Sequence, residues 1–310
     1  MAVRIFSTSQ NNNAIHTPTR LDENSLNSLL ATASRCMSSN RFLTFDLSNL
    51  QFIEPIGVAA LTCLGEYPLT NWSVRYNGLD GSNDALSYLH AVQYTNYIRN
   101  QAINSHPNPY QNYIPLNVFR EGQYNNFLYN ELAPWLEQKL TLHPETTESI
   151  RVNLEEAYLN IRHHSGVKSG CTVAQFYPKL NLVRFAIADW GKGIPARVRE
   201  FTKGDKRMSD ADLLWKACQH GFSSKSVEGN RGYGLFNLTK YFVKNNGGSI
   251  FLKSGLGELI IKNDGPGAEP KLYQKNVAQP HKYYGTLLGI TLRTDNLIDG
   301  PMEREDLEWT

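Results

Sequence analysis

Two polar residues that could act on one ligand lie four positions apart in one segment with helical periodicity. Glu156 and Asn160 are about one helical turn apart, so their side chains lie on the same flank of the helix. A carboxylate can take a proton from an attacking water, and an amide oxygen can coordinate magnesium held by phosphates. Taken alone, such a pair is usually solvated, so its interpretation depends on the motifs that follow it.

An aspartate and two glycines come directly after an apolar run. The motif Asp189-x-Gly191-x-Gly193 follows residues 182–188, which have the character of a mostly buried strand. A carboxylate at a strand end can accept a hydrogen bond from an adenine amino group, and glycines let the backbone approach a ligand closely. The alternative interpretation is a tight turn that merely ends the strand.

A third motif is rich in glycine and precedes a helical pattern. Residues 229–235 read GNRGYGL, and residues 236–244 continue as a helix. Backbone N–H groups at the start of a helix can bind phosphate. A single glycine-rich loop of this kind is weak evidence, so the order of the three motifs along the chain carries the argument.

The elements that must position these residues can be predicted from periodicity. The clearest is a helix over 148–164, whose core-facing residues are Ile150, Leu154, Ala157, Tyr158 and Ile161. The others are a helix over 21–37, a strand over 42–47, a helix over 56–64 entered through Pro55, and a helix over 126–140 in which Pro134 predicts a kink or an end. Three prolines and many Asn and Tyr over 101–123 indicate a crossing between domains.

The order of the motifs resembles the N, G1 and G2 boxes of the GHKL ATPases, whose ATP-binding domain has the Bergerat fold. The family includes sensor histidine kinases, anti-sigma-factor serine kinases, type II topoisomerases, mismatch-repair ATPases and a chaperone family. Two further segments fall where the family has them, GFSSK at 221–225 and Gly285-Thr286 before the last predicted strand. The resemblance covers residues 126–310.

This resemblance implies a role for each matching residue. Glu156 would be the general base and Asn160 a magnesium ligand, while Asp189 would contact the adenine. The remaining nucleotide-binding residues would be Gly191, Gly193 and Ile194 beside the adenine, Ser224, Lys225, Arg231, Gly232, Tyr233, Gly234 and Leu235 in the phosphate lid, and Thr286 as a support for the adenine. Asn230 departs from the pattern, because many kinases have a glycine two residues before Gly232.

Residues 42–61, FLTFDLSNLQFIEPIGVAAL, resemble the core of a STAS domain, the fold of anti-anti-sigma factors. Phosphorylatable members carry a serine after the acidic residue at the start of the helix. Here Glu54 is followed by Pro55 and Ile56, and neither has a hydroxyl group. The resemblance therefore implies a docking or regulatory module without an acceptor at this turn, and the alternative is an unrelated small α/β domain.

The expected fold is α+β with two domains. A STAS-like α/β domain over 1–105 is followed by a connector over 106–125 and by a Bergerat-type α/β sandwich over 126–310 that binds ATP. The length of 310 residues and the hydrophobic content of 41% suffice for two cores.

Composition excludes several classes of protein. The net charge of +2, from 31 basic and 29 acidic residues, is unlike the basic surface of a nucleic-acid-binding protein. No apolar run approaches the roughly 20 residues of a membrane span. Four scattered cysteines form no C-x-x-C pair, which argues against zinc and disulfides and favours the cytoplasm.

Three functions fit these motifs. The first is an ATP- and magnesium-dependent serine kinase of the anti-sigma-factor branch, which the spacing from Glu156 to His164 resembles most closely. The second is an ATPase that acts as a conformational switch without phosphotransfer, and the third is an ATP-binding scaffold without turnover. A protein partner is expected on the N-terminal domain, a homodimer is compatible with all three, and a sensor histidine kinase is disfavoured because no paired-helix segment with an acceptor histidine precedes Glu156.

Overall fold

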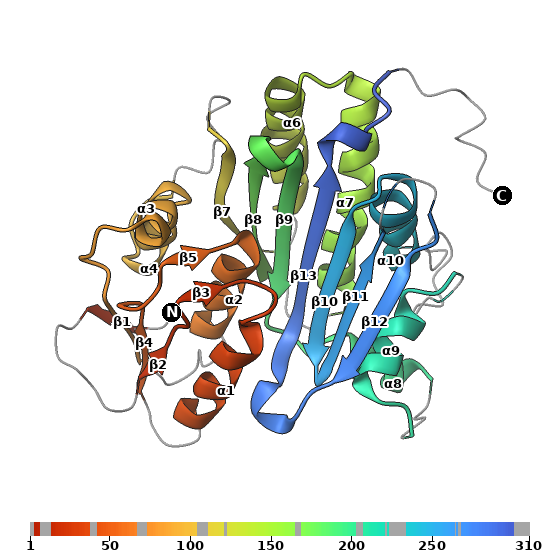
Figure 1. Ribbon diagram of the computed structural model, residues 1–310. Helices are drawn as coiled ribbons and strands as arrows, with labels where there is room; N and C mark the ends of the chain where they lie inside the picture. The colour runs from red at the N-terminus through yellow and green to blue at the C-terminus, as the bar shows by residue number, and fades with distance from the viewer. Residues whose placement is uncertain are drawn as a thin grey trace.

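The computed structural model describes residues 3–6, 14–37, 42–66, 73–103, 111–120, 123–164, 169–202, 207–220, 222, 234–263, 265 and 268–300. It is a mixed α+β structure organised around one large antiparallel sheet (Figure 1). In this part of the chain, no helix has both the length and the apolar character that crossing a membrane requires.

The large sheet has the strand order β12-β11-β10-β13-β9-β8-β7, and each strand is antiparallel to its neighbours. Its strands are β7 (Tyr113–Arg120), β8 (Ser169–Tyr177), β9 (Leu182–Asp189), β10 (Ser249–Gly255), β11 (Gly257–Lys262), β12 (Lys271–Asn276) and β13 (Tyr283–Arg293). Short 3-10 turns are η2 (Pro178–Leu180), η4 (Gln279–His281) and η5 (Thr294–Asn296).

The central strands of this sheet are buried on both faces. In β9, Phe185 and Ile187 belong to the core on one face, while Ala186 and Ala188 belong to the core on the other. This double burial explains why residues 182–188 are almost continuously apolar. In an antiparallel sheet with one solvent-exposed face, each strand would instead alternate apolar and polar residues.

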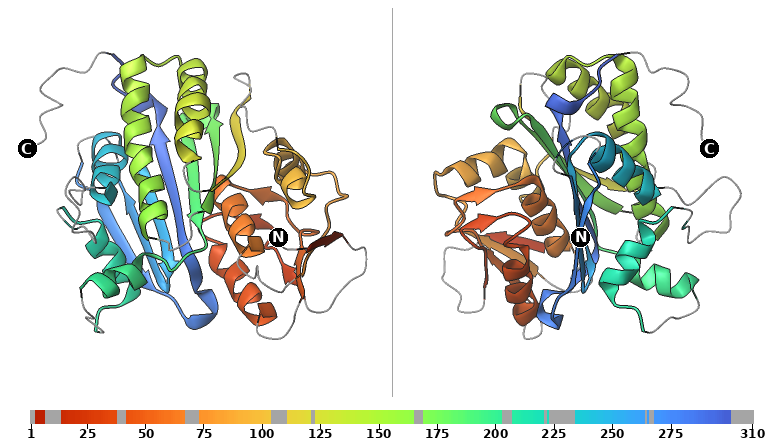
Figure 2. Two further views of the ribbon diagram at one scale, coloured as in Figure 1. Left: turned by 180° about the vertical axis from the view of Figure 1, so that it is seen from behind. Right: turned by 45° about the vertical axis from the view of Figure 1, so that its right-hand side comes forward.

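One face carries the C-terminal helices, which Figure 2 shows on one side of the sheet. They are α5 (Tyr124–Phe127), the π-helical turn η1 (Leu128–Leu132), α6 (Ala133–Leu140), α7 (Pro144–His164), α8 (Ile194–Phe201), α9 (Asp210–Ala217), α10 (Gly234–Leu238) and the π-helical turn η3 (Thr239–Asn245). Helix α7 packs against α10 and the sheet, with Ile150, Leu154, Ala157 and Tyr158 buried. Those four residues confirm the predicted core face of the helix, and the side chain of Ile161 lies outside the described residues.

Residues 3–103, here called the N-terminal unit, cover the opposite face of the large sheet (Figure 2). Their strands are β1 (Val3–Phe6), β2 (Ile15–His16), β3 (Arg20–Leu21), β4 (Phe42–Asp46), β5 (Phe52–Ile53) and β6 (Ser73–Asn77), and their helices are α1 (Leu26–Met37), α2 (Pro55–Glu66), α3 (Asp84–Ala91) and α4 (Tyr94–Ile98). A parallel sheet has the order β1-β6-β4-β2, and β3 pairs separately with β5.

Helix α2 joins the two halves of the molecule. Every residue from Pro55 to Gly65 is buried, because the helix lies between the N-terminal unit and strands β8, β9 and β13 of the large sheet. At this contact the thiols of Cys63 and Cys171 lie 3.9 Å apart. A helix buried on all sides must be apolar all round, as this one is.

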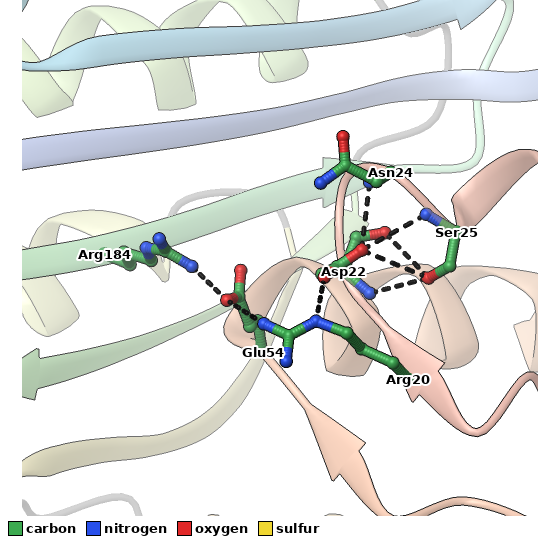
Figure 3. A network of polar contacts seen from close by, with 6 residues as sticks. All are labelled: Arg20, Asp22, Asn24, Ser25, Glu54 and Arg184. Atoms are coloured by element: carbon green, nitrogen blue, oxygen red, sulfur yellow. Dashed lines mark hydrogen bonds and ion pairs between the residues drawn. The ribbon is translucent and has the colours of Figure 1, made fainter.

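Charged side chains border the same contact (Figure 3). Glu54, at the start of α2, forms an ion pair with Arg184 of β9 and lies 3.5 Å from the guanidinium of Arg20. Burial raises the pKa of the nearby Glu23 carboxyl to about 7. Gly289 of β13 lets helix α2 pack closely against the large sheet, since a Cβ at this position would lie 2.9 Å from Cδ1 of Ile56.

Two predicted element boundaries differ from the structure by four residues or more. Helix α1 begins at Leu26 and not at Leu21, because Leu21 pairs in β3 and Asp22 accepts hydrogen bonds from the N–H groups of Asn24 and Ser25. Helix α7 begins at Pro144, four residues before the predicted start, and a proline is favourable in the first turn.

Two segments with a predicted character differ from the structure in kind. Residues 113–120, assigned to the connector, form the edge strand β7, where Pro115 is tolerated beside a shift in register between Ile114 and Asn117. The predicted helix over 126–140 contains the π-helical turn η1, which leads without a break into α6, where Pro134 is the second residue.

Candidate functional site

Asp189 ends strand β9 and is almost completely buried, with 1% of its surface exposed. Its Oδ1 accepts a hydrogen bond of 2.6 Å from the N–H of Gly191, and the hydroxyl and N–H of Thr286 also donate to the carboxylate. The predicted turn therefore exists, and the carboxylate also reaches across to the start of β13. Among the described residues, it is these donors and no ion pair that orient the carboxylate.

Burial dominates the electrostatics of this carboxylate. Loss of solvation raises the pKa of Asp189 to about 7, although the hydrogen bonds from Gly191 and Thr286 act in the opposite direction. An aspartate that titrates near neutral pH can present an acceptor in one state and a donor in the other. Such perturbed groups are concentrated at functional sites.

Gly285 allows strand β13 to come close to Asp189. Its φ of +97° is unfavourable for other residues, and a Cβ there would lie 2.2 Å from the backbone oxygen of Asp189. The next residue, Thr286, is thereby placed beside the carboxylate. The predicted importance of Gly285-Thr286 thus has a steric basis.

The loop after Asp189 leads directly into α8. Gly193 has a φ of +79°, and Ile194 is the first residue of the helix. The N–H of Ile194 donates to Oγ of Ser254 on β10 at 3.0 Å. The glycine loop is therefore fixed to the sheet on the side where the C-terminal helices pack.

A small, partly open cavity of about 20 Å³, room for about one water molecule, lies between these elements. Its walls come from α7, β9, the start of α8, α10, β10 and β13, and the residues that line it are Ala157, Ile187, Ile194, Leu235, Leu252, Thr286 and Leu288. Thr286 is the only one of these that is polar. The cavity is therefore apolar, with the bonded pair Thr286 and Asp189 at one end.

Three of the predicted site residues line the cavity, namely Ile194, Leu235 and Thr286. Asp189 is hydrogen-bonded to the lining residue Thr286 but is not itself among the lining residues, while Gly191 and Gly193 form the loop between Asp189 and Ile194. Gly234 is the first residue of α10. The structure thus brings together segments that are up to about 130 residues apart in sequence, from Ala157 to Thr286.

Glu156 immediately precedes the cavity residue Ala157 on α7. Its carboxyl is half-buried, and burial together with the negative charge of Glu155 raises its pKa. Glu155 itself accepts a hydrogen bond of 2.7 Å from the buried guanidinium of Arg151. Glu156 is therefore better suited than Glu155 to accept a proton.

Part of the predicted site cannot be placed. Asn160 belongs to the backbone of α7, but its side chain lies outside the described residues. The predicted lid residues Ser224, Lys225, Arg231, Gly232 and Tyr233 also lie outside the described residues. Among the residues that the structure does describe, no three His, Cys, Asp or Glu side chains are grouped so that they could hold a metal ion.

Four cavity residues had no predicted site role: Ala157, Ile187, Leu252 and Leu288. Alternation along strands could have identified two of them, since Ile187 lies two residues before Asp189 and Leu288 two residues after Thr286, on the same faces. Ala157 could have been identified as the small residue on the core side of the helix next to Glu156.

Comparison with known proteins adds no relative. No protein-family model matches this chain, and no curated protein matches its sequence. The assignment of a function therefore depends on the geometry of the cavity and of the residues around it.

Proposed function

We propose that the chain binds an adenine nucleotide with magnesium in the cavity beside Asp189, in a Bergerat-type domain of the GHKL kind, preceded by a STAS-like N-terminal domain. The observation that carries this proposal is the composition of the cavity wall. Helix α7, the start of α8 directly after the glycine loop, the start of α10 and the start of β13 all contribute to it, and the motifs occur in or next to these segments.

The cavity is small in this structure, and it is the chemistry of its lining that suits a flat, largely apolar base with a polar edge. Ile187, Leu252 and Leu288 supply apolar walls, and small-molecule sites combine such walls with a few placed polar groups. The ionised carboxylate of Asp189, oriented by Thr286, accepts from the adenine amino group. A guanine would direct a carbonyl oxygen toward that carboxylate, so adenine is preferred.

Helix α7, which contributes Ala157 to the cavity wall, would carry the residues that act on the phosphates. Glu156 would take the proton from a water molecule or from a partner's serine hydroxyl, and its raised pKa makes it a stronger base than an exposed glutamate. Asn160 would hold magnesium, which neutralises charge on the phosphates when it is bound. Ser224, Lys225, Arg231, Gly232, Tyr233 and Gly234 would enclose the phosphates.

Three versions of the proposal differ in the fate of the γ-phosphoryl group of ATP. It is transferred to a protein, released by hydrolysis or kept on the bound nucleotide. The first is phosphorylation of a partner's serine, with the N-terminal unit as the docking module in the cytoplasm. The second is a nucleotide-dependent switch without phosphotransfer. The third is an ATP-binding scaffold.

Titration with ATP and with GTP in the presence of magnesium tests binding first. We expect ATP to bind and GTP to bind more weakly, and equal affinities would contradict the role of Asp189. Incubation with γ-labelled ATP then follows the label. Label on a partner protein supports the kinase, label in free phosphate supports the switch, and bound ATP with neither supports the scaffold.

A further inference from the structure

Ser254 is a buried hydroxyl group at the end of strand β10, where three strands meet the glycine loop. It has no exposed surface and lies opposite Thr286 in the register of β10 with β13. The pairing shifts between Ser254 and Gly255, so the strand bends away immediately afterwards. Ser254 is thus the last residue of β10 in regular register at this end of the sheet.

The hydroxyl of Ser254 connects two walls of the cavity. Its Oγ accepts a hydrogen bond of 3.0 Å from the N–H of Ile194 and donates one of 2.6 Å to the backbone oxygen of Gly285. A hydroxyl has one proton to donate and lone pairs that accept, so this arrangement uses both of its capacities. Both linked residues are at the cavity: Ile194 lines it, and Gly285 precedes the lining residue Thr286.

The backbone packs closely around this connection. A Cβ on Gly193 would lie 2.4 Å from Oγ of Ser254 and 2.8 Å from the backbone oxygen of Gly285. The glycine therefore lets the loop approach until its next N–H reaches the hydroxyl. A Cβ on Gly285 would in turn lie 2.8 Å from Oδ1 of Asp189, so the spacing between loop, hydroxyl and carboxylate is tightly constrained.

We infer that Ser254 is a positioning residue for recognition of the adenine amino group, acting through Gly285 and Thr286 on Asp189. It connects the N–H at the start of α8 to the backbone that carries Thr286, and so sets the position of Thr286 against the carboxylate. The inference rests on the proposed function, because it assigns a role within the same site.

The test compares ATP with purine riboside triphosphate, which lacks the amino group, in the wild-type protein and in Ser254→Ala. Loss of the two hydrogen bonds should weaken ATP binding roughly tenfold and leave purine riboside triphosphate within about threefold. The ratio of the two affinities should therefore fall. An unchanged ratio, with both nucleotides weakened equally or not at all, would overturn the inference.

Ser209→Ala serves as the matched control. Ser209 caps α9 through a hydrogen bond with the N–H of Asp212, so its loss lowers stability without touching the cavity. We expect it to leave the affinity ratio unchanged, which separates positioning from general destabilisation. If Ser254→Ala does not fold, Ser254→Cys, which keeps a weak donor, should show the same loss of ratio in smaller measure.

Hydrogen exchange of the Ile194 N–H separates the inference from the proposed function. Without nucleotide, this N–H should be protected in the wild-type protein and exchange faster in Ser254→Ala. If the wild-type protein binds no ATP, the proposed function fails while this measurement still reports on the connection. If exchange is the same in both proteins, the positioning role fails even where ATP binds.

Discussion

Lowering the pH from about 8 to about 6 should weaken ATP binding about tenfold, because the adenine amino group needs an acceptor and protonation of Asp189 removes one. Burial raises the pKa of this carboxyl to about 7. About 9% of it is then ionised at pH 6 and about 91% at pH 8, which gives the factor of ten. The affinity is therefore fully present above the raised pKa and is lost as the pH falls through it.

The neighbouring titratable groups do not share this transition. Cys63 and Tyr283 lie close enough to affect one another and Asp189, but burial raises the pKa values of both well above their ordinary values. Both stay neutral between pH 6 and 8. Of these three groups, the carboxyl of Asp189 is thus the one that changes charge in this range.

The assay is calorimetric titration with ATP and magnesium over this pH range. Asp189→Asn is the control, since the ATP phosphates themselves titrate near pH 6 and their contribution remains in the variant. Inosine triphosphate should show the reverse trend, because its carbonyl oxygen accepts from the protonated acid. An ATP affinity with the same pH dependence in both proteins would refute the role of Asp189.

Three further outcomes are expected. Glu156→Gln should leave ATP bound and lower turnover by roughly 10²–10⁴-fold, whereas Glu155→Gln should retain turnover. The rate of phosphate release measures both variants. The reverse result would place the general base one residue away. Gly289→Leu should lower the free energy of unfolding by about 1–3 kcal/mol in urea denaturation through overpacking where the N-terminal unit meets the sheet, and an unchanged stability would mean that this contact is loose. Glu54→Gln should cost about 1–3 kcal/mol in the same assay, and Asp295→Asn, at an exposed ion pair, less than about 1; equal losses would contradict the buried role of Glu54.

Periodicity was sufficient to predict some of the elements that carry the site, although not strand β10 or helix α8. The core face of α7 and the strand that ends at Asp189 both follow from the spacing of apolar residues, and helix α2 was predicted to within two residues at its C-terminus. These features are local, because each depends on residues that are neighbours in sequence. The predicted residues that line the cavity, Ile194, Leu235 and Thr286, lie in or next to motifs that are likewise local in sequence.

Long-range contacts account for what the sequence did not indicate. Strand β7 was obscured by Pro115 and its polar neighbours, because only its place at the sheet edge makes the proline acceptable. Nothing around Ser254 in sequence distinguishes it from an ordinary serine, since its partners Ile194 and Gly285 lie 60 and 31 residues away. The ion pair of Glu54 with Arg184 likewise joins distant segments.

The most direct test of adenine nucleotide binding in this cavity is the methyl NMR spectrum of the protein during titration with ATP and magnesium. We expect the methyl signals of Ile187, Leu252 and Leu288 to shift, because these side chains line the cavity. Ile250 and Ile290 are the internal control, since they lie in the same core on β10 and β13 but not in the cavity wall, and should shift little. No shift in the cavity methyls at saturating ATP, or equal shifts in both sets, would contradict the account.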